Sequence, residues 1–224
     1  MSLTNVLVAV NVVAFVWELA TDGPNVDHGY LYGPAVVQGG EWWRIVTAAF
    51  LHGSIVHVGL NMLALYQVGN VVEVLFGKFR FLLLYALAIA GSGFAVLYFS
   101  YNQYTLGASG AIFGLFGALV AAGLRMGARG RALVGQVIPV ILINLVFTFS
   151  IPNISAAAHV GGLITGFLAG LLLFRAPRAP RYAYAYAGAP DESAREVETI
   201  EQPPAAAPHE AEDAPPLELR DPRE

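Results

Sequence analysis

The sequence predicts an all-α membrane protein, a bundle of six transmembrane helices followed by a disordered C-terminal tail. Of the 224 residues, 56% are hydrophobic and only 12% are charged, and the mean hydropathy is +0.59. Soluble domains typically carry about 25% charged residues. Six apolar stretches also approach the length of roughly 20 residues that a helix needs to cross a bilayer. The composition therefore favours lipid as the surroundings of most of the chain.

The six expected spans follow one another closely along the first three quarters of the sequence. In chain order they are 3–20, 53–73, 81–99, 109–126, 132–150 and 157–174. The first span has no Lys or Arg before it and no convincing cleavage site after it, so we expect it to be retained and not removed as a signal peptide.

Basic residues occur at alternate connections between these spans. Those beside the spans are Lys78 and Arg80, then Arg125, Arg129 and Arg131, then Arg175, Arg178 and Arg181, whereas only Arg44 lies in a connection of opposite parity. The positive-inside rule then predicts a cell-membrane protein with both termini in the cytoplasm. The second, fourth and sixth spans would each begin at the outer face.

The chain changes character after residue 175. Residues 1–175 carry a net charge of +2, whereas residues 176–224 carry −6 and most of the prolines. A segment rich in Pro, Ala and Glu buries too little apolar surface to offset the entropy lost on ordering. We therefore expect a membrane core, residues 1–175, and a disordered cytoplasmic tail, residues 176–224.

A serine and a histidine stand at the starts of two of the expected spans. Ser109 opens the fourth span and His159 lies in the first turn of the sixth, so the orientation places both at the outer end. Serine becomes a useful nucleophile when a neighbouring base takes its proton, and histidine titrates closest to neutral pH. The pair suggests a hydrolase that works within the membrane.

The second span brings further polar residues to the same depth. His57 and Asn61 are four residues apart, so they share one helical face and could offer two donors to a developing oxyanion. His52 lies a turn earlier and away from that face, and we expect it to shape the mouth of the cavity.

Glycines favour a close approach of the fourth and sixth spans. Gly162, Gly166 and Gly170 follow His159 on nearly its own face, and the fourth span carries Gly110, Gly114 and Gly117. Small residues at such spacing let membrane helices pack tightly. Phe113 lies one turn below Ser109, where its ring could stack on the imidazole or simply pack.

Four motifs in this order resemble those of the rhomboid intramembrane serine proteases, and the resemblance covers residues 1–175. They are Glu41-Trp42-Trp43-Arg44, the His52/His57/Asn61 spacing, Gly107-Ala108-Ser109-Gly110 and Ala158-His159-Val160-Gly161-Gly162. The resemblance implies a six-span, prokaryote-like rhomboid fold and serine endopeptidase activity.

The resemblance also assigns roles to residues. Ser109 would be the nucleophile and His159 the general base, with an oxyanion hole formed by His57, Asn61 and the Ser109 backbone N–H. Arg44 would lie in a first loop that sits partly in the outer leaflet and braces the fold. Many relatives carry tyrosine where this chain has Phe113, so stacking would survive without a phenolic hydrogen bond.

No acidic residue of the core is directed toward His159 by the sequence, so we expect a Ser109–His159 dyad without a third carboxylate. The expected substrates are transmembrane segments of other proteins, cleaved near the outer face, with no cofactor, no metal and no nucleic-acid partner. His52 and His57 lack the spacing and the glutamate of an H-E-x-x-H zinc motif. The oligomeric state stays open.

Two other classes of function are alternatives. A transporter would need a polar path that continues inward, whereas the polar residues here gather toward one face. A catalytically inactive rhomboid-like factor for binding or quality control of membrane proteins would lose Ser109 or His159, and both are present.

Overall fold

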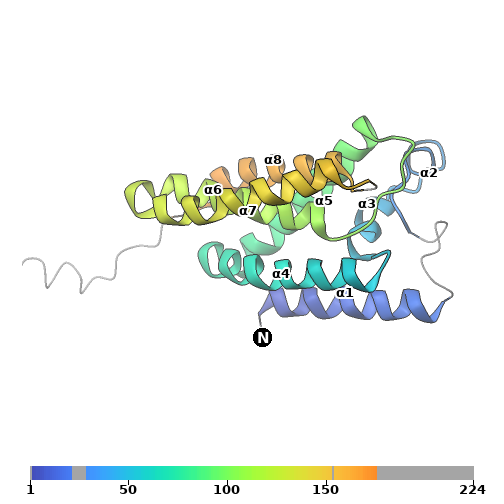
Figure 1. Ribbon diagram of the computed structural model, residues 1–224, viewed down its shortest axis with the longest axis horizontal. Helices are drawn as coiled ribbons and strands as arrows, with labels where there is room; N and C mark the ends of the chain where they lie inside the picture. Colours follow the sequence, from blue (N-terminus) through green and yellow to red (C-terminus); the bar gives the residue numbers. More distant parts are fainter. Residues whose placement is uncertain (1, 22–28, 153, 176–224) are drawn as a thin grey trace, which may run out of the picture. The chain divides into compact units, whose positions relative to one another are not determined.

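The computed structural model describes residues 2–21, 29–152 and 154–175, and these form a helical bundle (Figure 1). Its long helices are α1 (Leu3–Ala20), α4 (Ile55–Phe76), α5 (Lys78–Phe99), α6 (Ser109–Arg125), α7 (Arg131–Ser150) and α8 (Ala156–Leu173). Short helices fill the connections: α2 (Gly33–Val37), α3 (Arg44–Thr47), and the 3-10 turns η2 (Ala48–Phe50) and η3 (Gly127–Gly130). The predicted tail, residues 176–224, lies outside the described residues.

Five of the described helices are long and apolar enough to cross a membrane, one fewer than the six spans expected. The exception is α6, which has 17 residues and an axial length of about 25 Å, against about 30 Å for a hydrocarbon core. This helix is buried along most of its length, from Gly110 to Gly123. Because neighbouring helices surround it, little of its length has to match the lipid.

The connection between α4 and α5 is shorter than expected from hydropathy. We predicted spans ending at 73 and beginning at 81, whereas α4 continues to Phe76 and α5 starts at Lys78. The single residue between them, Gly77, has a φ of +78°, which favours glycine. Lys78 and Arg80 therefore lie in the first turn of α5. Hydropathy left them out of the span because they are charged, but charged residues at a membrane surface can still be helical.

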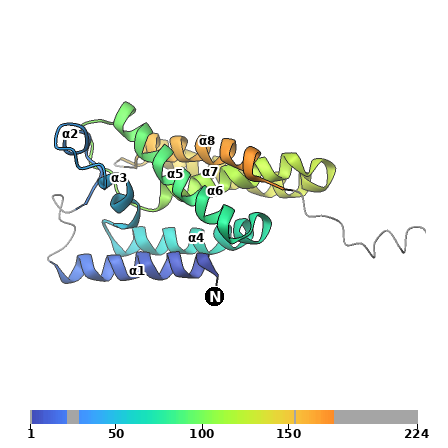
Figure 2. The same ribbon diagram turned by 180° about the vertical axis from the view of Figure 1, so that it is seen from behind.

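Glycines allow α6 and α8 to pack with their backbones in contact, side by side in both views (Figures 1 and 2). A Cβ atom at Gly162 would overlap the carbonyl oxygen of Gly110, and one at Gly166 would overlap that of Gly114. The close approach expected from the two glycine stripes is confirmed.

The start of α1 is bound to the end of α4 by a buried carboxylate. Glu73 accepts hydrogen bonds from the backbone N–H groups of Leu3 and Thr4 and from the Thr4 hydroxyl, each at 2.9 Å. The first N–H groups of a helix have no partner within it. Glu73 therefore caps α1 from the neighbouring helix, and it is fully engaged away from Ser109 and His159.

The connection between α1 and α4 reaches the segment that leads into α6. Leu31 and Thr105 form an isolated antiparallel bridge, with N–H···O distances of 3.0 and 2.9 Å. Arg44 is buried, donates to the carbonyl oxygen of Tyr30 at 3.1 Å and pairs with Glu41. These contacts hold the first connection against the start of α6.

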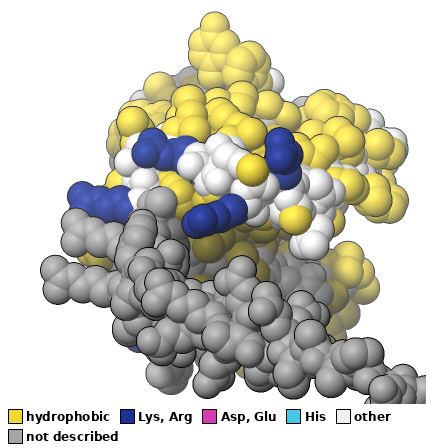
Figure 3. All heavy atoms as spheres, turned by 90° about the vertical axis from the view of Figure 1, so that its left-hand side faces the viewer, with side chains coloured by type: hydrophobic (Ala, Val, Ile, Leu, Met, Phe, Trp, Pro, Cys, Tyr) yellow, Lys and Arg dark blue, Asp and Glu magenta, His cyan; other side chains and the backbone are white. Residues whose placement is uncertain are grey.

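Basic side chains gather at the opposite end of the bundle, where α6 ends and α5 and α7 begin. Figure 3 shows this end, with Lys and Arg side chains spread over it. The residues that these helix ends contribute are Lys78, Arg80, Arg125, Arg129 and Arg131. The starts of α4, α6 and α8 lie together at the other end (Figure 1).

Candidate active site

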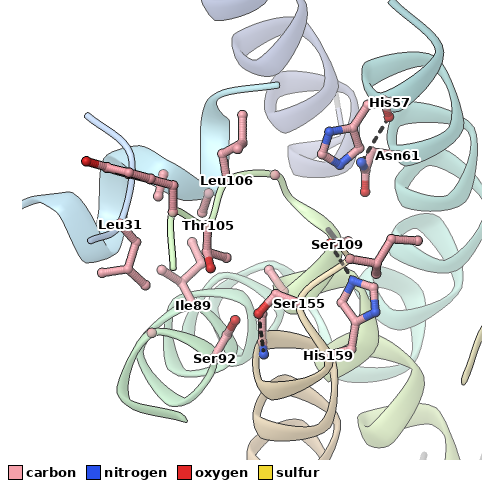
Figure 4. Close-up of a pocket in the computed structure, with 18 of the residues that line it drawn as sticks. Leu31, His57, Asn61, Ile89, Ser92, Thr105, Leu106, Ser109, Ser155 and His159 are labelled. Atoms are coloured by element: carbon pink, nitrogen blue, oxygen red, sulfur yellow. Dashed lines mark hydrogen bonds between the residues drawn. The ribbon is translucent and has the colours of Figure 1, made fainter. Parts of the chain in front are cut away.

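Ser109 and His159 are hydrogen-bonded where α6 and α8 begin. The Ser109 hydroxyl oxygen lies 2.7 Å from Nε2 of His159 (Figure 4). Ser109 is the first residue of α6, and His159 is in the first turn of α8, which the Ser155 side chain caps by accepting from the Ala158 N–H at 3.2 Å. Residues that are 50 positions apart in the sequence thus meet through the packing of two helices.

Phe113 stacks on the imidazole of His159. The two ring centroids are 4.3 Å apart and the planes are inclined by 13°. Phe113 is itself buried and also contacts Phe116 edge-on. The stack defines the plane in which the imidazole lies. Of the two alternatives for Phe113, stacking on the imidazole and simple packing, the structure shows the stacking.

The other ring nitrogen of His159 contacts a residue that the sequence analysis missed. Nδ1 lies 2.7 Å from the hydroxyl oxygen of Thr148, near the end of α7, and this threonine is 3% exposed. Within the part of the chain that the structure describes, both ring nitrogens are therefore paired with hydroxyl groups and neither with a carboxylate. A lone threonine in an apolar helix carries no sequence signal for such a contact, because its hydroxyl commonly bonds its own helix backbone.

His57 and Asn61 line the same cavity as Ser109 and His159, from the side of α4 (Figure 4). The Asn61 side chain donates one hydrogen bond to the His57 carbonyl oxygen at 2.9 Å. A Cβ atom at Gly107, whose φ is +115°, would lie 2.7 Å from Nε2 of His57 and 3.8 Å from the Ser109 hydroxyl oxygen. The imidazole of His57 therefore reaches the segment directly before the serine.

His52 does not shape the cavity mouth, contrary to our expectation. It is 1% exposed and lies outside the residues that line the cavity, with its ring edge-on to that of His57 at 5.0 Å. Its backbone N–H donates to Glu18 at 2.9 Å. Burial lowers the pKa of His52 to about 4, with a further contribution from His57. His52 is thus a neutral side chain packed behind His57.

The cavity itself has a volume of about 390 Å³, and both polar and apolar residues line it. The polar residues include His57, Asn61, Ser109 and His159, together with Ser92 and Ser155. The small and aliphatic residues include Ile45, Ala48, Ala49, Ile89 and Gly93.

Arg44 lies outside this cavity and acts on the first connection. Besides its bond to the Tyr30 carbonyl oxygen, its guanidinium lies 5.0 Å from the centre of the Trp43 ring. The backbone it holds continues into Leu31, which lines the cavity and is bridged to Thr105. Arg44 therefore holds backbone next to one wall of the cavity, and its expected role as a brace of the fold stays a prediction.

The fold and the site together define a helical membrane protein with a serine–histidine pair where two of its central helices begin. The rhomboid domain family model matches residues 39–176, which include Ser109, His159, His57 and Asn61. The chain belongs to the rhomboid family, and the family predicted from the four motifs is confirmed.

Several proteins of known sequence are similar to this chain. It is 43% identical to rhomboid protease GluP of Bacillus subtilis (strain 168) over 142 residues, which are 62% of this chain and 27% of GluP. It is 33% identical over 147 residues to RHOMBOID-like protein 4 of Arabidopsis thaliana, covering 63% of this chain and 36% of that protein. With rhomboid-like protease 1 of Toxoplasma gondii it shares 32% identity over 189 residues, 76% and 64% of the two chains. The chain thus spans only a part of the length of these relatives.

Proposed function

We propose that this protein is an intramembrane serine endopeptidase that cleaves transmembrane segments of other membrane proteins through a Ser109–His159 dyad. The observation that carries the proposal is the 2.7 Å contact between the Ser109 hydroxyl oxygen and Nε2 of His159 inside a cavity. The similarity to proteins named rhomboid proteases supports it. Retention of both residues argues against the inactive, binding-only alternative.

The chemistry follows from the two groups. Neutral His159 accepts the Ser109 proton while the hydroxyl oxygen attacks the scissile carbonyl carbon, forming a tetrahedral oxyanion. The imidazolium then gives that proton to the leaving amine, and the C–N bond breaks to leave an acyl-enzyme. A water molecule, deprotonated by His159 in turn, hydrolyses the ester and restores the serine.

Three groups can donate hydrogen bonds to the oxyanion, namely the Ser109 backbone N–H and the side chains of His57 and Asn61. Ser109 opens α6, so its backbone N–H has no acceptor within that helix. His57 and Asn61 approach the same cavity from α4. The first turns of α4, α6 and α8 also line the cavity, so the positive ends of their helix dipoles lie beside it. Donors in place before the reaction stabilise charge that develops only in the transition state.

For the topology, we propose six spans, with α6 as the fourth, in a cell membrane. The basic helix ends seen in Figure 3 support a cytoplasmic location for that end. Both termini and residues 176–224 are then cytoplasmic, residues 1–175 are the catalytic core, and the cavity opens toward the outer face. A helical substrate hides its carbonyl groups, so cleavage requires a locally unwound segment near that face.

The proposal is tested with a fluorophosphonate serine probe on the full chain in detergent. Wild type is expected to be labelled, whereas Ser109→Ala is expected to lose the label. Ser92→Ala is a matched control that should keep the label. Ser92 lines the same cavity, but the two ring nitrogens of His159 are hydrogen-bonded to Thr148 and Ser109. Equal labelling of wild type and Ser109→Ala would remove Ser109 as the nucleophile.

Cleavage is then measured in proteoliposomes with single-span reporter proteins, and the product ends are sequenced. Product ends within the reporter span, absent with Ser109→Ala, are expected. A labelled protein that binds reporters and cuts none would favour the binding-only alternative.

A further inference from the structure

Thr148 occupies an unusual place for a threonine in a membrane helix. It lies near the C-terminal end of α7, buried, with its hydroxyl oxygen 2.7 Å from Nδ1 of His159 on α8. The same oxygen lies 2.7 Å from the carbonyl oxygen of Asn144, one turn earlier on α7. One hydroxyl group therefore stands between a backbone carbonyl and the imidazole.

The number of protons settles the direction of these two hydrogen bonds. A hydroxyl group has one hydrogen, and a carbonyl oxygen can only accept, so the Thr148 hydrogen points to Asn144. Toward His159 the hydroxyl oxygen can then only accept. Nδ1 must supply the hydrogen of that bond, and in a neutral imidazole Nε2 is left with a lone pair. That lone pair faces the Ser109 hydroxyl group.

Stacking on Phe113 does not provide this selection. A stack holds the plane of the imidazole, but a half-turn about the Cβ–Cγ bond returns the ring to the same plane and exchanges Nδ1 with Cδ2 and Nε2 with Cε1. The two orientations present opposite faces of the ring to Phe113, and either face can stack. Hydrogen-bonding partners at the ring nitrogens distinguish them, and these are Ser109 at Nε2 and Thr148 at Nδ1. The Ser109 hydroxyl can donate or accept, so it does not select the tautomer, whereas Thr148 can only accept.

We propose that Thr148 is a positioning residue that holds His159 in the Nδ1–H tautomer and in the ring orientation that aims Nε2 at Ser109. The inference rests on the proposed function and deepens it. Thr148 fills the place that a carboxylate has in a serine–histidine–aspartate triad, but as a neutral acceptor. Three helices then determine the dyad, because α6 supplies the nucleophile, α8 the base and α7 the group that orients the base.

Nitrogen NMR of the full chain labelled with ¹⁵N-histidine in detergent reads the tautomer without requiring activity. In wild type we expect the His159 signals, assigned by their loss in His159→Gln, to show a protonated Nδ1 and an unprotonated Nε2. Thr148→Ser keeps the hydroxyl and should preserve this pattern. Thr148→Val removes the hydroxyl group at nearly the same side-chain volume. Its His159 signals should show a mixture of the Nδ1–H and Nε2–H tautomers. Thr165→Val, on the side of α8 that contacts Gly91, is the control.

Turnover of a reporter gives the second measurement. Loss of the group that orients a metal-binding histidine typically costs about 10- to 100-fold, and we apply that range to Thr148. We expect a decrease of that size in kcat for Thr148→Val with little change in KM, recovery in Thr148→Ser, and wild-type kinetics in Thr165→Val. An effect that Thr148→Ser does not recover, although it folds, would overturn the proposal.

The tautomer of His159 distinguishes a failure of the positioning role of Thr148 from a failure of the proposed protease function. An Nε2-protonated His159 in wild type overturns the positioning role even if Thr148→Val fails to fold, while Ser109 labelling still supports the protease. An unchanged tautomer in a folded Thr148→Val also overturns it. An Nδ1-protonated His159 that depends on Thr148, in a protein without Ser109 labelling, supports the orienting contact while the protease function fails.

Discussion

Gly162 of α8 lies directly against the carbonyl oxygen of Gly110 of α6, leaving no space for a side chain between the two backbones. Gly110 immediately follows Ser109, and Gly162 lies one turn after His159. The contact that brings the two helices together is therefore adjacent to the contact that joins the serine to the histidine. Helix separation and the geometry of the dyad are coupled at this point.

Gly162→Ala should consequently damage both folding and the site. Its methyl group would force α6 and α8 apart, and overpacking of this kind costs about 1–3 kcal/mol of unfolding free energy. We expect a lower thermal unfolding temperature in detergent together with reduced probe labelling of Ser109. Gly135→Ala on α7 is the control, because a Cβ atom there would project into open space. Equal behaviour of the two variants would contradict the coupling.

The cleavage rate should depend on the aromatic ring of Phe113 and not only on the volume of its side chain. Aromatic stacking contributes about 0.5–1.5 kcal/mol, so its loss in Phe113→Leu should slow turnover by up to about tenfold. Phe113→Tyr keeps the ring and should retain the rate. Steady-state cleavage of a reporter measures both. Phe116→Leu, one turn further along α6 and edge-on to Phe113, should leave the rate unchanged, and an equal loss there would indicate general packing.

Asn61→Ala should reduce turnover by about 10²–10³ if Asn61 donates to the oxyanion. Asn70 on the same helix offers a matched control, because its side chain also donates to the backbone carbonyl one turn earlier, at 2.7 Å, but that hydrogen bond is exposed. Asn70→Ala removes the same kind of helix bond away from the cavity. Cleavage rates that fall equally in both variants would assign Asn61 a purely structural role.

His52 should make the fold sensitive to acid. Its pKa is lowered to about 4 by burial, below the ordinary value of 6.5 that the unfolded chain is expected to have. Between these values the unfolded state binds more protons, so stability is complete above about pH 6.5 and falls as the pH decreases toward 4. One such group changes the unfolding free energy by at most about 1.4 kcal/mol per pH unit.

In His52→Gln this contribution is absent. The unfolding temperature in detergent, measured from pH 7.5 to 4, should therefore fall less steeply than in wild type, each relative to its own value at pH 7.5. Parallel curves for the two proteins would show that His52 is already protonated in the folded state or titrates alike in both states.

Hydropathy located the helices that lead into the site with useful accuracy. We expected starts at 109 and 157, and α6 and α8 begin at Ser109 and Ala156. The starts are set locally, for example by the Ser155 side chain that caps α8. The α4–α5 boundary was less well predicted, because hydropathy excludes charged residues such as Lys78 from a span whether or not the backbone is helical.

The prediction that His52 shapes the cavity mouth was wrong for a different reason. We placed it by helical spacing from His57, but α4 begins at Ile55 after the Ser54 cap. His52 therefore lies in non-helical chain, where a period of 3.6 residues has no meaning. Its burial behind His57 depends on the approach of Glu18 from α1, which no local pattern contains.

The sequence by itself determined that this is a helical membrane protein of the rhomboid family, because apolar length, glycine spacing and short motifs are properties of neighbouring residues. It also indicated Ser109 and His159 as a pair. Only the tertiary structure decided that Thr148 contacts the second nitrogen of that histidine and that His52 is buried. Such contacts depend on the rotation and depth of helices relative to one another, which packing sets over the whole bundle and no local segment encodes.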